Sequence, residues 1–476
     1  MNKLTIESNS SWSGNQLFWF RSAFIFFIIM SVPLQWSWFE RLFAIDIFDL
    51  TYRDLYEISG YNPRIWSVPT ESGRWGLASF TDWLIIFIIA LAGAAIWSYF
   101  VRNKKTKAYN NLYYWIQVIV RYRVAAGLIT FGYVKLFPVQ MPAPSITVLN
   151  TEIINILSQK LYWSSVGIVT WYEVFLGFAE IFAGALMFSR RSSSLGACLT
   201  IGVLFNIFLA NIYYDGGVHV YALYFVPLSL FLLIQDFPKV WQLLANEKDT
   251  LLNRYRPALN RTAYYTTRGL KYLFIGIYLP FQFYIMYSNH YIEVKVRKQP
   301  VQAGLKNSAG YYEVSEFKLN GKTIPYSPYD TVRWQTATFE KWTTFTYRVN
   351  KPFFPDLSNG GPAKKDIDRN FEYSGVAGGQ RFLYYEADTT NHALTFYDKN
   401  LPPNVIKGKI RSSKRERDLA EKSRITFTLT YSRPTISSLV LSGLNEQKDS
   451  LYIVLNKIDK RYPLIDGRRQ LATNSN

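Results

Sequence analysis

Cysteine and histidine, which most often form redox pairs and metal sites, are almost missing from this chain. Its 476 residues include one cysteine, Cys198, inside an apolar run, and three histidines. A single cysteine excludes an intrachain disulfide, a CxxC redox pair and a cysteine-ligated zinc or iron–sulfur site. The histidines do not recur at metal-ligand spacing, so we expect no metal site. His219 and His290 fall near expected helix ends, which disfavours a haem held between them.

A dense basic patch is also missing, although the formal net charge is +19. Lys and Arg fall in loops between apolar runs and along a polar C-terminal third, a pattern typical of a membrane protein. We therefore expect no nucleic-acid partner. The chain is instead 49% hydrophobic and 17% aromatic. This composition favours a protein whose partner is the lipid bilayer.

About seven apolar stretches reach the roughly 20 residues that cross a bilayer. They lie near residues 18–38, 82–101, 117–136, 167–188, 195–213, 219–235 and 270–288. The first lacks a small-residue cleavage site, so we interpret it as an uncleaved helix. The basic loops fall on one side of the membrane if the N-terminus is cytoplasmic. We therefore expect a multi-pass protein of a bacterial inner (cytoplasmic) membrane, with its C-terminal part in the periplasm.

From about residue 291 the apolar residues follow period two instead. YYEVSEFKLNGKTI, QRFLYYEA and SLYIVLNKI are typical of these segments, and Asn320–Gly321 is a hairpin turn signal. About eight such strands with short links predict an antiparallel sandwich or small barrel. The expected fold class is thus an all-α polytopic membrane bundle followed by an all-β soluble domain. This β domain shows no catalytic triad, nucleotide-binding loop or metal-ligand spacing.

Two carboxylates lie inside the apolar stretch TWYEVFLGFAEIFAGALMF. Glu173, Gly177, Glu180 and Gly184 follow one another at spacings of four, three and four, which places them on one narrow stripe of a helix. The glycines would let a neighbouring helix approach closely. Ionisable groups inside a span are costly and face a bundle interior or a watery cavity.

Partners for these carboxylates are expected on neighbouring helices. Lys135 lies near the outer end of its helix, at a depth suited to pairing with Glu173, because the two helices run antiparallel. Glu180 lies nearer mid-depth, where Tyr133 and Asn206 are the candidate partners. Lys135 would supply the counter-charge, and Tyr133 and Asn206 would orient a ligand.

Three further polar residues complete the candidate pocket. Arg123 lies toward the cytoplasmic end of its helix, while Asp215 and His219 lie at the expected outer mouth. Two interpretations stay open for the whole set. The residues are either satisfied interhelical pairs that specify the bundle, each contributing about 1 kcal/mol, or a polar cavity that binds a small polar head or relays protons.

The segments RYRVAAGLITFGYVKLFPVQMPAPS, WYEVFLGFAEIFAGALMFSRRSSSLGA and NIFLANIYYDGGVHVYALYFVPLSLFLL together carry a family pattern. The pattern is an R…G…K(L/F)FP helix, an E…G…E…AG…L…RR helix and an N…YD segment. It resembles the DoxX-like family of small four-helix membrane proteins, in a longer Bacteroidetes-type version with a C-terminal β domain. The resemblance covers roughly 117–236, about a quarter of the chain.

The apolar spans, the loop charges and this resemblance together predict a domain order. Two helices and an extracytoplasmic loop (1–116) would precede the four-helix core (117–236), a cytoplasmic loop with the last span (237–290) and an extracytoplasmic β domain (291–476). The family takes its name from a membrane subunit linked to a quinol oxidase and to thiosulfate:quinone oxidoreduction. The resemblance therefore implies a redox-associated accessory subunit that binds quinone, with no catalytic residue assigned. In that scheme the β domain would dock a periplasmic or membrane protein partner.

Two other function classes remain open. The chain could be a small-solute transporter, although its sequence shows no internal repeat or interrupted helix pair of the kind that such folds favour. It could also be a structural anchor that displays the β domain. Uptake or efflux of a small solute by reconstituted vesicles, dependent on Glu180, would support the transporter alternative. If the chain is a structural anchor, replacing its membrane helices with an unrelated membrane anchor should preserve function.

Overall fold

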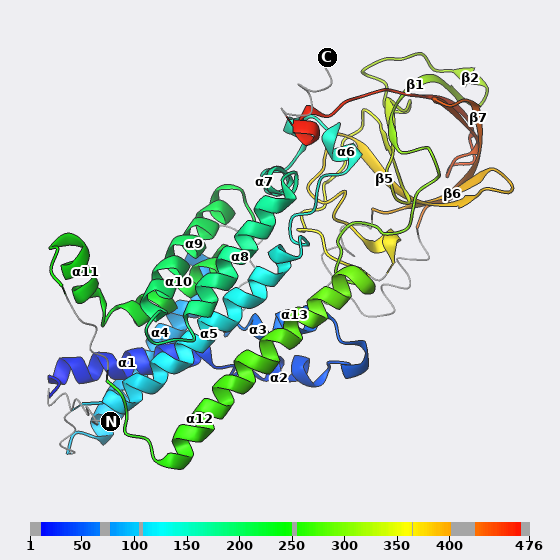
Figure 1. Ribbon diagram of the computed structural model, residues 1–476. Helices are drawn as coiled ribbons and strands as arrows, with labels where there is room; N and C mark the ends of the chain where they lie inside the picture. The colour runs from blue at the N-terminus through cyan, green and yellow to red at the C-terminus, as the bar shows by residue number, and fades with distance from the viewer. Residues whose placement is uncertain are drawn as a thin grey trace. The chain divides into compact units, whose positions relative to one another are not determined.

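The computed structural model describes residues 11–66, 77–103, 108–249, 255–363, 365–400 and 424–467. The chain divides into two compact units. The helical unit comprises residues 1–137 and 174–292, and the β unit comprises residues 138–173 and 293–476 (Figure 1). The predicted helical segments 1–116, 117–236 and 237–290 therefore contribute to one unit, apart from residues 138–173. Residues 138–173, which the sequence placed inside a continuous four-helix core, belong with the β strands.

Local sequence signals mark the start of two helices of the helical unit. Ser13 and Gln16 form a capping box at the start of the first helix, and Thr51 and Asp54 form another at the start of the third. The unit contains α1 (Gly14–Ser31), α2 (Trp36–Phe43), α3 (Tyr52–Ser59), α4 (Thr81–Phe100), α5 (Asn110–Leu136), α8 (Thr170–Leu186), α9 (Ser193–Tyr213), α10 (His219–Leu233), α11 (Phe237–Ala245), α12 (Arg261–Leu273) and α13 (Leu279–Tyr287). The start of α8, up to residue 173, belongs to the β unit. A π-helical turn, Phe274–Tyr278, joins α12 to α13.

Among the described residues, three helical segments are long and apolar enough to cross a membrane: Gly14–Phe43, Ala78–Phe100 and Ser193–Tyr213. The number rises to five if each of two bent helix pairs is one span, namely α7 (Ser158–Gly167) with α8, and α10 with α11. The seven predicted spans are therefore not confirmed. The predicted spans 117–136 and 270–288 are helical, as α5 and as part of α12–α13, but neither is among the three to five.

Helix α5 is the central element of the helical unit. It packs against α1, α3, α10 and α13, while α1 also packs against α4 and α9 against α10 (Figure 1). Its buried residues include small ones such as Ala125, Gly127 and Gly132, which allow close helix approach. Arg123 and Lys135 are also buried, so charged side chains of α5 lie inside the unit.

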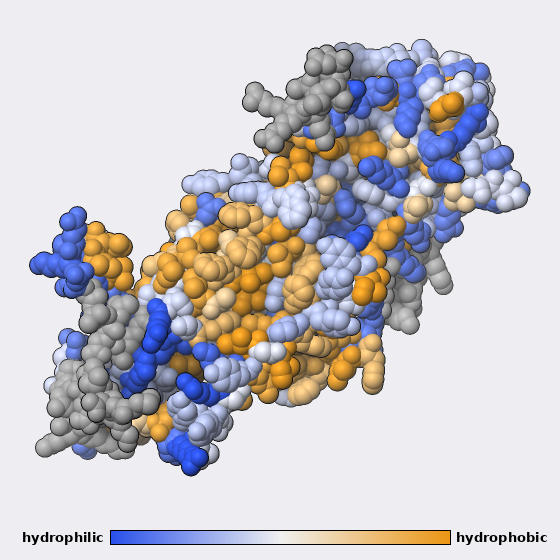
Figure 2. Space-filling view, in the orientation of Figure 1, coloured by the Kyte–Doolittle hydropathy of each residue, from blue (hydrophilic) through white to orange (hydrophobic). Residues whose placement is uncertain are grey.

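The surface of the helical unit is strongly apolar. Figure 2 shows hydrophobic residues covering most of the visible helical face. Large apolar side chains are exposed on α4 and α8, among them Ile88, Ile96, Phe175 and Phe178. A contiguous apolar surface of this kind is typical of contact with lipid. The helical unit thus has the surface of a membrane protein.

The β unit is built on a closed antiparallel sheet. Its strands are β1 (Gly310–Leu319), β2 (Lys322–Thr323), β3 (Thr336–Phe339), β4 (Thr344–Arg348), β5 (Gln380–Asp388), β6 (Ala393–Asp398), β7 (Thr426–Thr435), β8 (Ser438–Leu444) and β9 (Ser450–Lys457). From β3 to β9 each strand pairs with the next, and β1 pairs with both β3 and β9. Eight strands thus form a barrel, with β2 added beside β1 (Figure 1). The predicted strands and the barrel alternative are confirmed.

Alternation along the strands fills the barrel interior. In β7, every second residue from Phe427 to Tyr431 is buried, and the residues between them are exposed. Aromatic rings such as Phe339, Phe345 and Phe396 are fully buried inside the barrel. At the predicted hairpin turn, Asn320 and Gly321 have φ values of 51° and 76°, the left-handed conformation that favours these two residue types. The barrel therefore has a packed aromatic core.

The segment 138–173 attaches to the barrel through buried polar groups. Its helix α6 (Ile146–Leu149) donates the backbone N–H groups of Ile146 and Thr147 to the Glu340 carboxylate, at 2.9 and 2.8 Å. Burial raises the pKa of Glu340 to about 7 because desolvation outweighs these hydrogen bonds. On α7, the Lys160 ammonium donates to the Phe371 carbonyl and lies 3.7 Å from the centre of its ring. These contacts explain why residues 138–173 belong to the β unit.

Candidate functional site

The two charges at the centre of the candidate site form one buried ion pair. Lys135 Nζ lies 2.7 Å from Glu180 Oε1 and 2.9 Å from Oε2. The two residues are 5% and 2% exposed. Taking both charges out of water is costly, and it is offset only by a geometry in which the ammonium meets both carboxylate oxygens. The pair is therefore a strongly constrained feature of the α5–α8 contact.

Glycines bring the backbones of α5 and α8 together beside this pair. A Cβ added at Gly177 would lie 2.4 Å from the Leu136 backbone nitrogen and 2.6 Å from the Gly132 carbonyl oxygen. A Cβ at Gly184 would lie 3.2 Å from the Ala125 carbonyl oxygen. The predicted close helix approach along the glycine stripe is thus confirmed.

The predicted pairing of Lys135 with Glu173 is wrong, because Lys135 pairs with Glu180. Glu173 lies in the first turn of α8, where its Oε1 accepts the Met141 backbone N–H at 2.9 Å. Its side chain is fully buried and belongs to the β unit, not to the helical one. The two carboxylates of the stripe therefore serve different parts of the protein.

Arg123 lies at the other end of the buried face of α5. Its Nε donates to the Tyr224 hydroxyl at 3.1 Å, and its second terminal nitrogen donates to the Tyr221 hydroxyl at 3.3 Å and to the Tyr61 carbonyl. The guanidinium carbon also lies 5.1 Å from the centre of the Tyr224 ring. The cation is thus held by neutral aromatic and carbonyl groups.

Aromatic rings connect Arg123 to Lys135. Phe131 lies one turn before Lys135, whose Nζ is 5.8 Å from the centre of the Phe131 ring. The rings of Tyr56 and Tyr221 each lie 5.0 Å from that of Phe131. We call Arg123, Phe131 and Lys135, together with Glu180, the α5 column. Phe131 and Lys135 are four residues apart and are therefore neighbours on one helix face, whereas Arg123 is connected to Phe131 through Tyr221.

A neutral hydrogen-bond network lies on the adjoining face of α5. The Tyr52 hydroxyl donates to the Thr130 carbonyl at 2.6 Å. The Gln282 amide donates to the Ser59 and Tyr278 hydroxyls, at 3.0 and 2.7 Å. This network ties α3 and α13 to α5 through neutral groups.

The remaining predicted residues lie apart from the ion pair. Tyr133, predicted as a partner of Glu180, donates to the Leu279 carbonyl at 3.3 Å. Asn206, the other predicted partner, is exposed on α9. Asp215 lies in the turn before α10 with a φ of 58°, and His219 Nε2 is 3.2 Å from the Ser79 hydroxyl. Tyr133 and His219 thus lie against other polar groups, and Asn206 faces outward.

Sequence reasoning missed the aromatic members of this site. Phe131 lies four residues before Lys135, a spacing that places the two side chains next to each other on a helix and could have identified Phe131. Tyr221 and Tyr224 lie in an aromatic-rich helix, where no pattern distinguishes them from lipid-facing rings. Tyr56 comes from α3, a short helix whose packing against α5 depends on tertiary structure.

Comparison with known proteins finds a similarity over part of the chain. The chain is 33% identical over 85 residues to the uncharacterized protein YwoB of Bacillus subtilis (strain 168). These residues are 18% of this chain and 55% of that protein, so the chain spans about half the length of the curated relative that it matches. No protein-family model and no solved structure matches the chain.

Proposed function

We propose that the helical unit binds the polar head of a small lipid-soluble molecule at the α5 column, and that this molecule is a quinone. The observation that carries the proposal is the Lys135–Glu180 pair, buried in an otherwise apolar helix contact. A quinone carbonyl accepts hydrogen bonds from an ammonium, and reduction of a quinone requires proton donors nearby. Lys135 would donate to the carbonyl, Glu180 would exchange the proton, and the rings of Phe131 and Tyr56 would pack against the quinone ring.

The proposal places the protein in a bacterial inner membrane as a redox-associated accessory subunit of the DoxX-like kind. The apolar helices and the resemblance on 117–236 support this placement. The β unit would then lie in the periplasm and contact a partner of the redox complex. The reacting atoms would belong to the quinone and its redox partner, with this chain supplying binding and protons.

Quinone content and quinone binding test the proposal. Protein purified in mild detergent should carry a quinone that organic extraction and chromatography detect. A short-chain ubiquinone or menaquinone analogue should quench its tryptophan fluorescence. The variant Lys135→Met/Glu180→Met keeps apolar bulk at both positions and should retain the fold but bind the analogue at least about tenfold more weakly.

Asn206→Ala serves as the matched control, because it truncates a polar side chain exposed on α9. It should bind the analogue like the wild type. Wild-type protein that neither contains nor binds a quinone would refute the proposal. Equal binding by the folded Lys135→Met/Glu180→Met variant would refute the assigned site.

One observation favours a small-solute transporter as a second candidate. α10 and α11 form a bent pair with an angle of 82° between them, and interrupted helices are typical of transporter substrate sites. Uptake of a solute by reconstituted vesicles, abolished by Glu180→Gln, would favour this function over quinone binding.

A further inference from the structure

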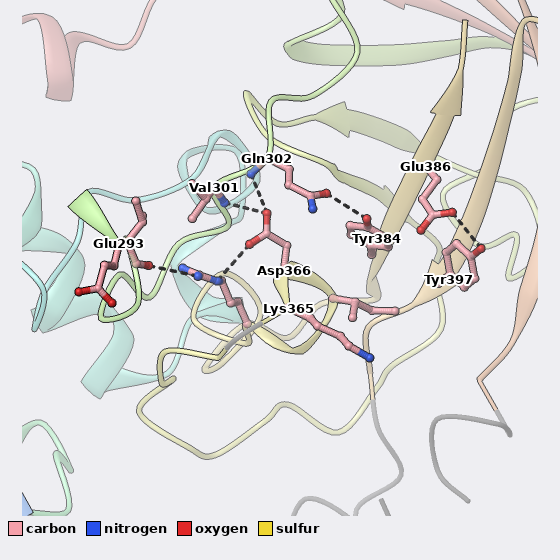
Figure 3. Close-up of a pocket in the computed structure, with 11 residues that line it drawn as sticks. Glu293, Val301, Gln302, Lys365, Asp366, Tyr384, Glu386 and Tyr397 are labelled. Carbon is pink, nitrogen blue, oxygen red and sulfur yellow. Dashed lines mark hydrogen bonds and ion pairs between the residues drawn. The ribbon is translucent and has the colours of Figure 1, made fainter. Parts of the chain in front are cut away.

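A hollow of about 680 Å³ lies on the outside of the barrel in the β unit. This volume is within the range of roughly 300–1,000 Å³ that is typical of small-molecule sites. Figure 3 shows its lining side chains, which come from β5, β6, the 293–302 segment and the 365–369 segment. The hollow belongs entirely to the β unit.

Strand alternation places aromatic rings on this outer face. In β5, Leu383 and Tyr385 point into the barrel core, so Tyr384 and Glu386 point outward. Tyr397 of β6 pairs directly with Tyr384 across the two strands. The two ring centres are 5.9 Å apart, and together the rings form an aromatic floor.

The wall opposite this floor is held rigidly. Asp366 accepts the backbone N–H groups of Val301 and Gln302, at 2.8 and 2.7 Å, and forms an ion pair with Arg369 at 3.0 Å (Figure 3). Asp366 and Arg369 are 6% and 4% exposed. These two residues therefore fix the shape of the hollow, and its accessible polar groups come from other side chains.

Planar acceptor groups lie beside the aromatic floor. The Tyr384 hydroxyl donates to the Gln302 amide oxygen at 3.0 Å, and the Tyr397 hydroxyl donates to Glu386 Oε2 at 3.2 Å (Figure 3). Glu386 itself is exposed. Each tyrosine thus presents part of its ring next to a group that can accept two hydrogen bonds.

We propose that this hollow binds a saccharide. The C–H face of a sugar ring packs against an aromatic ring, and adjacent sugar hydroxyls donate to a carboxylate or an amide. Tyr384 and Tyr397 supply the rings, and Gln302 and Glu386 supply the acceptors. The lining residues carry both signs of charge in nearly equal number (Glu293, Asp366, Glu386, Lys365 and Arg369), which disfavours a strongly charged ligand.

Two neutral oligosaccharides, chitotetraose and cellotetraose, test this proposal on the full chain. The protein is placed in lipid nanodiscs, because sugar-headed detergents would compete for the site. Saturation-transfer NMR should show binding of at least one probe. Tyr397→Ala and Glu386→Gln should each weaken that binding at least about tenfold, with thermal unfolding unchanged from the wild type.

Tyr452→Ala is the matched control, since it removes a tyrosine from β9 that does not line the hollow. It should bind the sugar like the wild type. Two results would overturn the proposal: no binding of either probe to the wild type, or equal loss of binding with Tyr452→Ala. Tight binding of a cationic peptide in place of both sugars would also overturn it.

Discussion

Replacing only one partner of the buried Lys135–Glu180 ion pair should lower the free energy of unfolding far more than replacing both partners. At 2.7–2.9 Å between Lys135 Nζ and the Glu180 oxygens, Coulomb's law with an effective dielectric constant of about 20 gives an attraction of roughly 6 kcal/mol. Desolvation of the two charges offsets most of this attraction. The measurable quantity is therefore the cost of leaving one charge buried alone.

We expect Lys135→Met and Glu180→Met each to lower the free energy of unfolding by about 3–5 kcal/mol, because each leaves an uncompensated charge. The double variant should lie within about 1 kcal/mol of the wild type, since methionine fits at both positions with little change of volume. Unfolding by SDS from mild detergent, followed by tryptophan fluorescence, measures all four proteins of this double-mutant cycle. Single variants that each cost less than about 0.5 kcal/mol, with additive effects, would refute a structurally coupled pair.

Two further predictions concern the helix contact and the β unit. Gly177→Leu should destabilise the α5–α8 contact by about 1–3 kcal/mol or more in the same SDS assay, whereas Gly202→Leu, where an added Cβ meets no atom within 4 Å, should have little effect. Glu340, whose pKa rises from 4.5 to about 7, stabilises the folded state fully below about pH 4.5 and loses this contribution as the pH rises to about 7. Thermal unfolding should therefore show stability falling by about 3 kcal/mol across this window, and a Glu340→Gln variant with the same pH dependence would contradict the assignment.

The β domain could be predicted from the sequence because its signals are local. Alternating apolar residues and the Asn320–Gly321 turn identify the strands, and from β3 to β9 each strand pairs with the next one in the chain. The glycine stripe of α8 was predictable for the same reason, since helical spacing alone places Gly177 and Gly184 on one face.

The partner of Lys135 could not be predicted because it depends on how α5 and α8 are aligned along their axes. The predicted span 167–188 agrees with α8 (Thr170–Leu186), but the length of a helix does not give this alignment. Glu173 lies in the first turn of α8 and bonds to Met141, and Lys135 pairs with Glu180 instead. The assignment of residues 138–173 to the β unit could not be predicted from the sequence either. The contacts of this segment, such as that of Lys160 with Phe371, join residues far apart in the chain.

The attachment of α6 to Glu340 has a consequence for the order in which the chain folds during synthesis. Ile146 and Thr147 emerge from the ribosome 194 and 193 residues before Glu340, the acceptor of their backbone N–H groups. Until then these groups must bond to water or to a chaperone. The barrel closes later still, because β1 pairs with β9, which is the last strand to be synthesised. The helices from α8 to α13 are made in the interval, so the segment 138–173 must stay available to the barrel strands until the helical unit has been synthesised.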